Sequence, residues 1–206
     1  MILHKYKCIF IHIPRTGGTS IESVLAGKNW WKVHPQSKHL NFISAKKIYN
    51  KYWDDYFKFT FVRNPWGRLL SLTKYSTNKQ PHDNIYPVHL DVLNRIKTNH
   101  FFDFFSNTEY DPRFFNANQF EKFKPFDQAY YRNIIGDEMD FIGKYENLQN
   151  DFDVVCEHLK IPSTTLPHVE KSVIDCSQYQ RCYDDDQRDL VYNQFKYDIE
   201  KYNYEF

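Results

Sequence analysis

Apolar and polar positions along the chain follow two periods, one typical of strands and one of helices. Residues 7–13 form a short apolar run that ends at Pro14, which predicts a buried strand. Residues 57–63 alternate and are rich in strand-forming residues, so they predict a second strand, and residues 140–145 predict a short third one. Helical spacing follows each of these runs.

The predicted helices cover residues 18–26, 44–51, 91–106, 147–159 and 186–202, with a further helix opened by Asn64 as N-cap and Pro65 in the first turn. Residues 80–135 are otherwise aromatic and irregular, and the order of their elements does not follow from the pattern. Strands that alternate with helices predict an α/β fold with a parallel sheet, which binds ligands outside the carboxyl ends of its strands.

Composition supports a globular protein, since 206 residues with 18 Phe, 16 Tyr and 4 Trp provide a large apolar surface to bury. No apolar run approaches the ~20 residues of a membrane span. The first residues show no secretory signal, so we expect a cytoplasmic protein whose four cysteines are reduced. Cys176 and Cys182 flank a polar turn and could pair, although nothing requires it. No Cys/His spacing predicts a metal site.

The net charge of +1 hides an asymmetry between the two parts of the chain. Residues 1–82 contain 14 Lys or Arg and three acids, a net charge of +11, whereas residues 83–206 contain 13 Lys or Arg and 23 acids, a net charge of −10. The basic part is suited to an anionic ligand, or the two parts simply pair with each other in the fold. Dispersed basic residues and a pI near 7.7 argue against a nucleic-acid partner.

The most informative motif is the loop between the first predicted strand and helix, Pro-Arg-Thr-Gly-Gly-Thr-Ser at residues 14–20. Two glycines let the backbone turn tightly, so that successive N–H groups can point at one anion beside the positive end of the helix. The candidate phosphate-binding residues are Arg15, Thr16, Gly17, Gly18, Thr19 and Ser20. The lysine of a Walker A motif is missing, and an ordinary glycine turn remains the alternative.

A second candidate anion site follows the second predicted strand. Arg63 ends that strand, and Arg68 and Ser71 are three residues apart on one face of the next helix. Arg63 and Ser71 could hold a second phosphate-sized anion, although a solvated basic helix would give the same pattern. Two anion sites on adjacent strand–helix units fit a nucleotide phosphorylated at two positions.

These motifs resemble those of the sulfotransferases that use 3′-phosphoadenosine 5′-phosphosulfate (PAPS). Within them the likeness is greatest to the branch of bacterial homologues and carbohydrate sulfotransferases such as heparan sulfate 2-O-sulfotransferase. The matching stretches are residues 9–22, 59–71 and 141–148, with weaker likeness at 166–172 and 198–206. The resemblance implies a P-loop-like three-layer α/β fold, with a central parallel sheet flanked by helices, in a single sulfotransferase domain covering residues 1–206.

The resemblance also implies roles for individual residues. Residues 14–20 match the loop that binds the 5′-phosphosulfate, and Arg63 and Ser71 match the pair that binds the 3′-phosphate. Arg15 stands where the family usually has lysine, which contacts the leaving phosphate and the sulfonate, so Arg15 is expected to act in catalysis as well as in binding. Arginine keeps the charge but not the compact ammonium, and this difference bears on rate more than on binding.

His39 resembles in position the catalytic histidine of the family, and imidazole is suited to removing a hydroxyl proton at neutral pH. His34, in the same loop, is a less favoured alternative for the base. His12, within the strand before the glycine loop, is expected to pack in the interior or to support a residue of the site. The implied reaction transfers the sulfonyl group in line from PAPS to an acceptor hydroxyl, on a carbohydrate by family likeness, and releases 3′-phosphoadenosine 5′-phosphate (PAP). It needs no metal.

Two other readings remain open from the sequence. A P-loop kinase of unusual pattern is disfavoured by the missing lysine and the missing second acidic motif. A non-catalytic relative that binds nucleotide or glycan is disfavoured because His39 and the charge of Arg15 are present. The acceptor is expected to contact residues 28–43 and 80–135, which match no readable motif.

Overall fold

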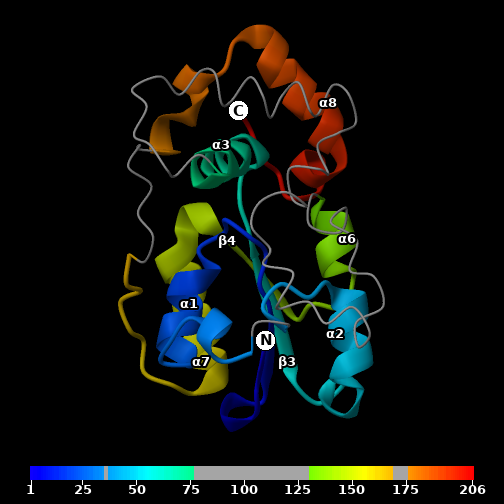
Figure 1. Ribbon diagram of the computed structural model, residues 1–206, viewed down its shortest axis with the longest axis vertical. Helices are drawn as coiled ribbons and strands as arrows, with labels where there is room; N and C mark the ends of the chain where they lie inside the picture. The colour runs from blue at the N-terminus through cyan, green and yellow to red at the C-terminus, as the bar shows by residue number, and fades with distance from the viewer. Residues whose placement is uncertain (35–36, 77–129, 169–175) are drawn as a thin grey trace.

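A computed structural model describes residues 1–34, 37–76, 130–168 and 176–206 of the chain (Figure 1). The strands are β1 (Ile2–Leu3), β2 (Cys8–Ile11), β3 (Phe57–Val62) and β4 (Phe141–Lys144). The helices are α1 (Gly18–Leu25), α2 (Phe42–Ile48), α3 (Pro65–Ser76), α6 (Tyr131–Ile135), α7 (Leu148–Leu159) and α8 (Asp185–Lys201). Short 3₁₀ segments occur at His4–Tyr6, Trp30–Lys32, Asn50–Tyr52, Tyr145–Asn147 and Cys176–Cys182. The helix expected at 91–106 lies outside the described residues.

The sheet has the strand order β1-β2-β3-β4. Strands β2, β3 and β4 are parallel, with Phe10 opposite Phe59 and Phe59 opposite Phe141. These are the three strands that the sequence predicts, and their arrangement confirms the α/β class. The sequence does not predict β1, because two residues are too few for a period. This strand lies antiparallel to β2, with Ile2 opposite Ile9, so the sheet is only mostly parallel.

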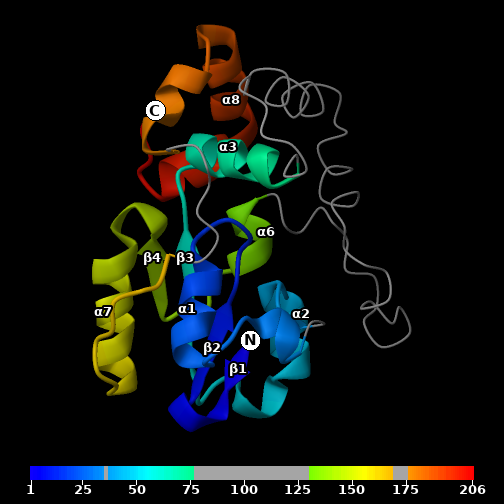
Figure 2. The same cartoon turned by 60° about the vertical axis from the view of Figure 1, so that its left-hand side comes forward.

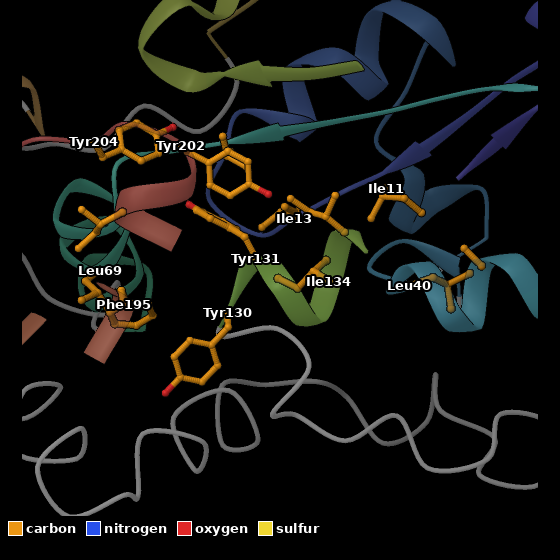
Figure 3. Packing of buried hydrophobic residues seen from close by; sticks show 14 of the residues in the cluster. Ile11, Ile13, Leu40, Leu69, Tyr130, Tyr131, Ile134, Phe195, Tyr202 and Tyr204 are labelled. Carbon is orange, nitrogen blue, oxygen red and sulfur yellow. The ribbon is translucent and has the colours of Figure 1, made fainter. Parts of the chain in front are cut away.

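Helices cover both faces of the sheet, with α1 and α7 on one side and α2 and α6 on the other (Figure 2). Alternate residues of a strand point to opposite faces. Ile9 and Ile11 therefore pack in a cluster with α2, α6 and α8, part of which Figure 3 shows. Phe10, Phe59 and Phe61 pack with α1 and α7 in a second cluster. Burial on both faces explains why β2 is a continuous apolar run in the sequence.

Two asparagines determine where helices begin. The Asn41 side chain accepts a hydrogen bond from the Ser44 N–H at 2.9 Å, so α2 begins at Phe42, two residues earlier than the pattern indicates. The Asn64 side chain accepts from the Trp66 N–H at 3.1 Å, which confirms Asn64 as the cap of α3. The first turn of α3 therefore lies directly after the carboxyl end of β3, beside the loop that follows β2.

The last segment of the chain returns to the end of the sheet. Asp184 caps α8 through its side chain, which accepts a hydrogen bond from the Gln187 N–H, and Asp198 near the other end is buried. The Asp198 carboxylate accepts the Tyr131 N–H at 2.8 Å, at the first turn of α6. The Asn64 side-chain amide donates to the Glu205 carbonyl at 2.7 Å. Residues far apart in the sequence therefore hold the carboxyl end of β3 in place.

Cys8 and Cys156 form no disulfide and are buried among apolar side chains. Trp30 belongs to the core cluster that packs with α1 and α7. Among the helices of the described segments, none has the length and apolar character needed to cross a lipid bilayer.

Candidate active site

The glycine loop joins β2 to α1 and lies at the carboxyl end of the parallel strands, the edge where open α/β sheets bind ligands. Two residues with positive φ turn the chain there, Arg15 at +67° and Gly17 at +84°. Helix α1 begins at Gly18, so the positive end of its dipole faces the loop. The expected strand–loop–helix unit is therefore present at residues 8–25.

Both glycines of the loop are needed for close packing. A Cβ atom on Gly18 would lie 2.2 Å from Cδ2 of the His12 ring, which is far inside van der Waals contact. A Cβ on Gly17 would lie 2.7 Å from a methyl group of Leu148 at the start of α7, and its positive φ already disfavours a side chain. His12 thus packs directly beneath the first turn of α1.

The hydroxyl residues of the loop have different surroundings. Thr16 is fully buried, and its Oγ1 donates to the Ile13 carbonyl at 2.9 Å, so this hydroxyl stabilises the loop itself. Ser20 is buried in the first turn of α1, whereas Thr19 is partly exposed. Of the three candidate hydroxyls, Thr19 has the most solvent access.

Three arginines converge on the loop. Arg63 Nη1 donates to the Arg15 carbonyl at 3.3 Å, and Arg68 Nε donates to the Pro14 carbonyl at 3.1 Å. Arg15 Nε in turn donates to the Ser71 hydroxyl at 2.9 Å. The structure therefore brings Arg15, Arg63 and Ser71 together, although up to 56 residues separate them in the sequence. Three guanidinium groups at this edge of the sheet are suited to bind an anion.

Arg63 is held from several sides and is only 5% exposed. Its guanidinium carbon lies 4.0 Å from the centre of the Tyr145 ring, a cation–π arrangement. Its backbone is held by Tyr131, whose hydroxyl donates to the Arg63 carbonyl at 2.5 Å and accepts from the Arg63 N–H at 3.0 Å. Because Asp198 accepts the Tyr131 N–H, helix α8 contributes indirectly to this position.

His39 is half-buried next to His12, with the two ring centres 4.5 Å apart in an edge-to-face arrangement. Its Nδ1 lies 2.9 Å from the His12 carbonyl oxygen, which can only accept, so Nδ1 carries the proton and Nε2 of the neutral ring carries the lone pair. Burial, with the positive charge of Lys38 nearby, holds the pKa of His39 well below 6.5. His34, the alternative, is exposed and bonds to Ser37 through Nδ1.

A buried group of charges lies next to these histidines. Glu22, on α1, is fully buried; its Oε1 accepts from His12 Nδ1 at 2.5 Å, and its Oε2 accepts from Lys38 Nζ at 2.6 Å and from the Trp30 N–H at 3.0 Å. Lys38 also donates to the Asn29 side chain at 2.6 Å. Burial alone would raise the pKa of the Glu22 carboxyl, but the hydrogen bond from His12 and the charge of Lys38 lower it to about 2.

A family model of known proteins matches the chain over residues 1–205, and its description is that of the sulfotransferase family. The chain belongs to the sulfotransferase family. A curated protein, TBCC domain-containing protein 1 of Xenopus tropicalis, is 31% identical over 64 residues, which make up 31% of this chain and 12% of that protein. So short a match carries no functional assignment. No solved structure matches the chain significantly.

The sequence motifs of this sulfotransferase predict no role for Glu22, Lys38, Tyr131 or Tyr145. One signal was available for Glu22, because it shares a helix face with Leu25 three residues later, and an acid on an apolar face needs a buried partner. Tyr131 and Tyr145 carry no such local signal, since both contact Arg63 only through the tertiary fold.

The described parts of this sulfotransferase contain no cluster of side chains suited to bind a metal ion. Within those residues, no three His, Cys, Asp or Glu side chains gather in a way that could hold a metal ion. The charged groups nearest the loop are the arginines, which bind anions directly.

Proposed function

We propose that this sulfotransferase moves a sulfonyl group from PAPS to a hydroxyl of a carbohydrate acceptor. The observation that carries the proposal is the convergence of Arg15, Arg63 and Ser71 at the glycine loop. A single phosphate group would need only one such anion site. A loop with a helix N-terminus on one side and a buried arginine and serine on the other suits a nucleotide charged at both its 5′ and 3′ positions.

In this proposal each end of the donor has its own residues. The backbone of Thr16, Gly17 and Gly18, with the side chains of Thr19 and Ser20, binds the 5′-phosphosulfate at the start of α1. Arg63 and Ser71 bind the 3′-phosphate. Arg15 lies between the two groups, since its side chain reaches Ser71 while its backbone belongs to the loop.

His39 is the proposed general base. Its Nε2 lone pair takes the proton of the acceptor hydroxyl while the hydroxyl oxygen forms a bond to sulfur. The bond between sulfur and the 5′-phosphate oxygen breaks on the opposite side, and the electron pair leaves with PAP. Arg15 and the loop N–H groups stabilise the charge that develops on the leaving phosphate. The low pKa of His39 keeps the ring neutral, and therefore able to accept the proton, at pH 7.

The P-loop-like architecture, the carbohydrate acceptor and the cellular location are part of the same proposal. Helices on both faces of a mostly parallel sheet support a P-loop-like three-layer architecture in one domain over residues 1–206. A carbohydrate acceptor rests on the likeness to carbohydrate sulfotransferases and is an analogy at the level of the family. A cytoplasmic location is proposed from the sequence alone.

Nucleotide preference tests the donor and separates the kinase reading from this one. Thermal unfolding is measured with PAP, with ADP and with ATP–Mg²⁺ at matched concentrations. A ligand at ~100 times its dissociation constant adds about 2.7 kcal/mol of stability, which is easily detected. We expect a shift with PAP that exceeds the shift with ADP. A shift with ATP alone would favour the kinase reading, and none at all would contradict nucleotide binding.

Turnover tests the base and separates an enzyme from a non-catalytic relative. The formation of PAP from PAPS is measured with unsulfated polysaccharides as acceptors. His39→Ala should reduce turnover at least ~100-fold, the usual contribution of a general base, while PAP still binds. The matched control is His34→Ala in the same loop, which should turn over normally. Normal turnover by His39→Ala, or a loss in His34→Ala instead, would overturn the assignment.

A further inference from the structure

We propose that the buried ion pair of Glu22 and Lys38 is a positioning device that holds His39 in the tautomer needed for proton abstraction. The inference rests on the proposed function, in which His39 is the base, and deepens it. It concerns residues that contact neither the loop anion site nor the acceptor hydroxyl. Glu22 and Lys38 are positioning residues that act through His12 and through the backbone next to His39.

The geometry gives Glu22 two separate tasks. One carboxylate oxygen binds His12 Nδ1 at 2.5 Å and the other binds Lys38 Nζ at 2.6 Å. A carboxylate only accepts, so Nδ1 of His12 carries its proton and the orientation of that ring is fixed. The exposed fractions of Glu22, His12 and Lys38 are 0%, 3% and 2%, so the bonds are shielded from water.

Both partners of Glu22 lead to His39. Lys38 precedes His39 directly, so anchoring of the Lys38 side chain fixes the backbone from which the His39 ring projects. The carbonyl of His12 accepts the proton of His39 Nδ1 at 2.9 Å, and the two rings are in edge-to-face contact. A ring held by its own backbone and by an acceptor at Nδ1 has a defined position for Nε2.

The same group of charges also ties the base to the donor loop. Glu22 lies on α1, the helix whose first turn faces the anion site. The His12 ring packs against Gly18, the first residue of that helix. The position of His39 relative to the loop is therefore set by one rigid arrangement, which is what an in-line transfer requires.

Stability alone gives little reason for such a pair. Replacing a buried ion pair by apolar residues of similar volume is often neutral or stabilising, whereas removing one partner alone is strongly destabilising. An apolar pair of Leu-like residues between α1 and the 29–39 loop would serve packing as well. Lys38 is the residue next to His39, and Glu22 bonds to His12, whose carbonyl accepts the proton of His39 Nδ1. These contacts favour a role for the pair in orienting the His39 ring.

Within the part of the chain that the structure describes, the charged or titratable groups that act on His39 are His12 after β2, Lys38 in its own loop and Glu22 on α1. Burial has the largest effect and lowers the His39 pKa, the charge of Lys38 lowers it further, and Glu22 opposes this to a smaller extent. Removing Glu22 and Lys38 together should therefore raise the His39 pKa toward its ordinary value.

The experiment reads His39 directly by NMR of protein labelled with ¹⁵N-histidine, with His39→Gln used to assign its signal. The wild-type ring should show protonated Nδ1 and unprotonated Nε2, with a titration midpoint below pH 6.5. In the double variant Glu22→Gln/Lys38→Met we expect a mixture of tautomers and a higher midpoint. PAP affinity, measured by calorimetry, should change less than about threefold, because the loop is intact.

Two further variants control for stability. Lys58 is also a buried lysine, paired with Asp140 at 3.0 Å, but it lies at the opposite end of β3 from the site. Lys58→Met should lower thermal stability and leave the His39 signal unchanged. Lys38→Arg keeps the cation and should retain the wild-type tautomer, even if the double variant fails to fold.

The outcomes separate the two proposals. The positioning role is overturned if His39 keeps its wild-type tautomer and titration midpoint in the double variant or in a Lys38→Met single variant. This holds whether or not the affinity for PAP changes. A wild-type protein that shows the expected tautomer but binds no PAP overturns the proposed function instead. A change of the His39 signal in Lys58→Met would show that loss of stability alone moves the ring, and would also overturn the positioning role.

Discussion

Single residues in the proposed donor site support the loop backbone as well as providing charge. Arg63 and Arg68 are 5% and 4% exposed, and each donates to a carbonyl of residues 14–15. Guanidinium groups held in this way lose little rotamer freedom when an anion binds. A substitution at either position therefore removes both a binding group and a support of the loop.

Arg63→Ala should weaken PAP binding by about 10- to 100-fold, because a hydrogen bond to a charged group contributes ~1.5–3 kcal/mol. ADP has no 3′-phosphate and should lose much less affinity. Isothermal calorimetry with both nucleotides measures the difference. Arg188→Ala is a suitable control, since this half-buried arginine pairs with acids on α8 and lies outside the proposed site. Equal losses for PAP and ADP would contradict the 3′-phosphate assignment.

The pKa of His39 gives a prediction for the pH dependence of catalysis. A base must be unprotonated, and burial holds the pKa of His39 well below 6.5. The rate of sulfonyl transfer should therefore stay level as pH falls to 6.5 and decrease only below it. The profile of kcat/KM against pH tests this, and an acid limb above pH 6.5 would argue for a base with an ordinary pKa.

At the scale of elements, the contact between the start of α1 and His12 joins the proposed anion-binding loop to the segment next to His39, the proposed base. Gly18 allows this contact because a Cβ there would overlap the His12 ring. Gly27, after α1, has a positive φ of +71°, but the space around it is open. The two glycines therefore differ in what a side chain would disturb.

Gly18→Ala should lower the free energy of unfolding by about 1–3 kcal/mol, the usual cost of overpacking, and should also weaken PAP binding because the first turn of α1 must shift. Gly27→Ala should lower stability by a similar ~1–2 kcal/mol through its positive φ and leave PAP binding unchanged. Denaturant unfolding and calorimetry measure the two effects. Unaltered PAP affinity in Gly18→Ala would show that the loop tolerates the shift.

Local patterns predict those elements whose cause is local. The apolar run before Pro14 and the cap at Asn64 lead directly to β2 and α3, and the helical spacing of residues 186–202 leads to α8. Strand β1 escapes prediction because it consists of two residues whose pairing partner lies elsewhere. The glycine-loop residues are recognisable as candidates because glycines and hydroxyl residues follow one another directly between a predicted strand and a predicted helix.

Contacts made at long range were not predictable from the same patterns. Lys38 is 16 residues from Glu22, and Tyr131 is 68 residues from Arg63, so only the tertiary fold brings each pair together. His39 is a candidate because its position resembles that of the catalytic histidine of the family. The tautomer of its ring depends on the backbone carbonyl of His12, and no pattern of side chains in the sequence reveals that contact.

For the whole molecule, two histidines buried in the neutral form link stability to pH. Burial lowers the pKa of both His12 and His39 in the folded protein, while in the unfolded chain both return to about 6.5. Below that pH the unfolded chain binds more protons than the folded one, so protonation favours unfolding.

The free energy of unfolding should therefore fall as pH decreases from 6.5 to 5.5, by up to about 1.4 kcal/mol per histidine. Denaturant titrations at several pH values measure the slope. His39→Gln should reduce the slope by the share of one histidine, whereas the exposed His34→Ala should leave it unchanged. A slope that is the same in His39→Gln would mean that His39 takes up its proton without unfolding.

The return of the C-terminal segment to the end of β3 has a consequence for biosynthesis. Asn64 bonds to the carbonyl of Glu205, 141 residues later, and Tyr131, which holds Arg63, depends on Asp198. At ~5–20 residues per second, the ribosome needs about 7–28 s to make that stretch. A nascent chain therefore carries β3 and its arginine for that time without the contacts that fix them, and a nucleotide meets the complete arrangement only after Glu205 has been made.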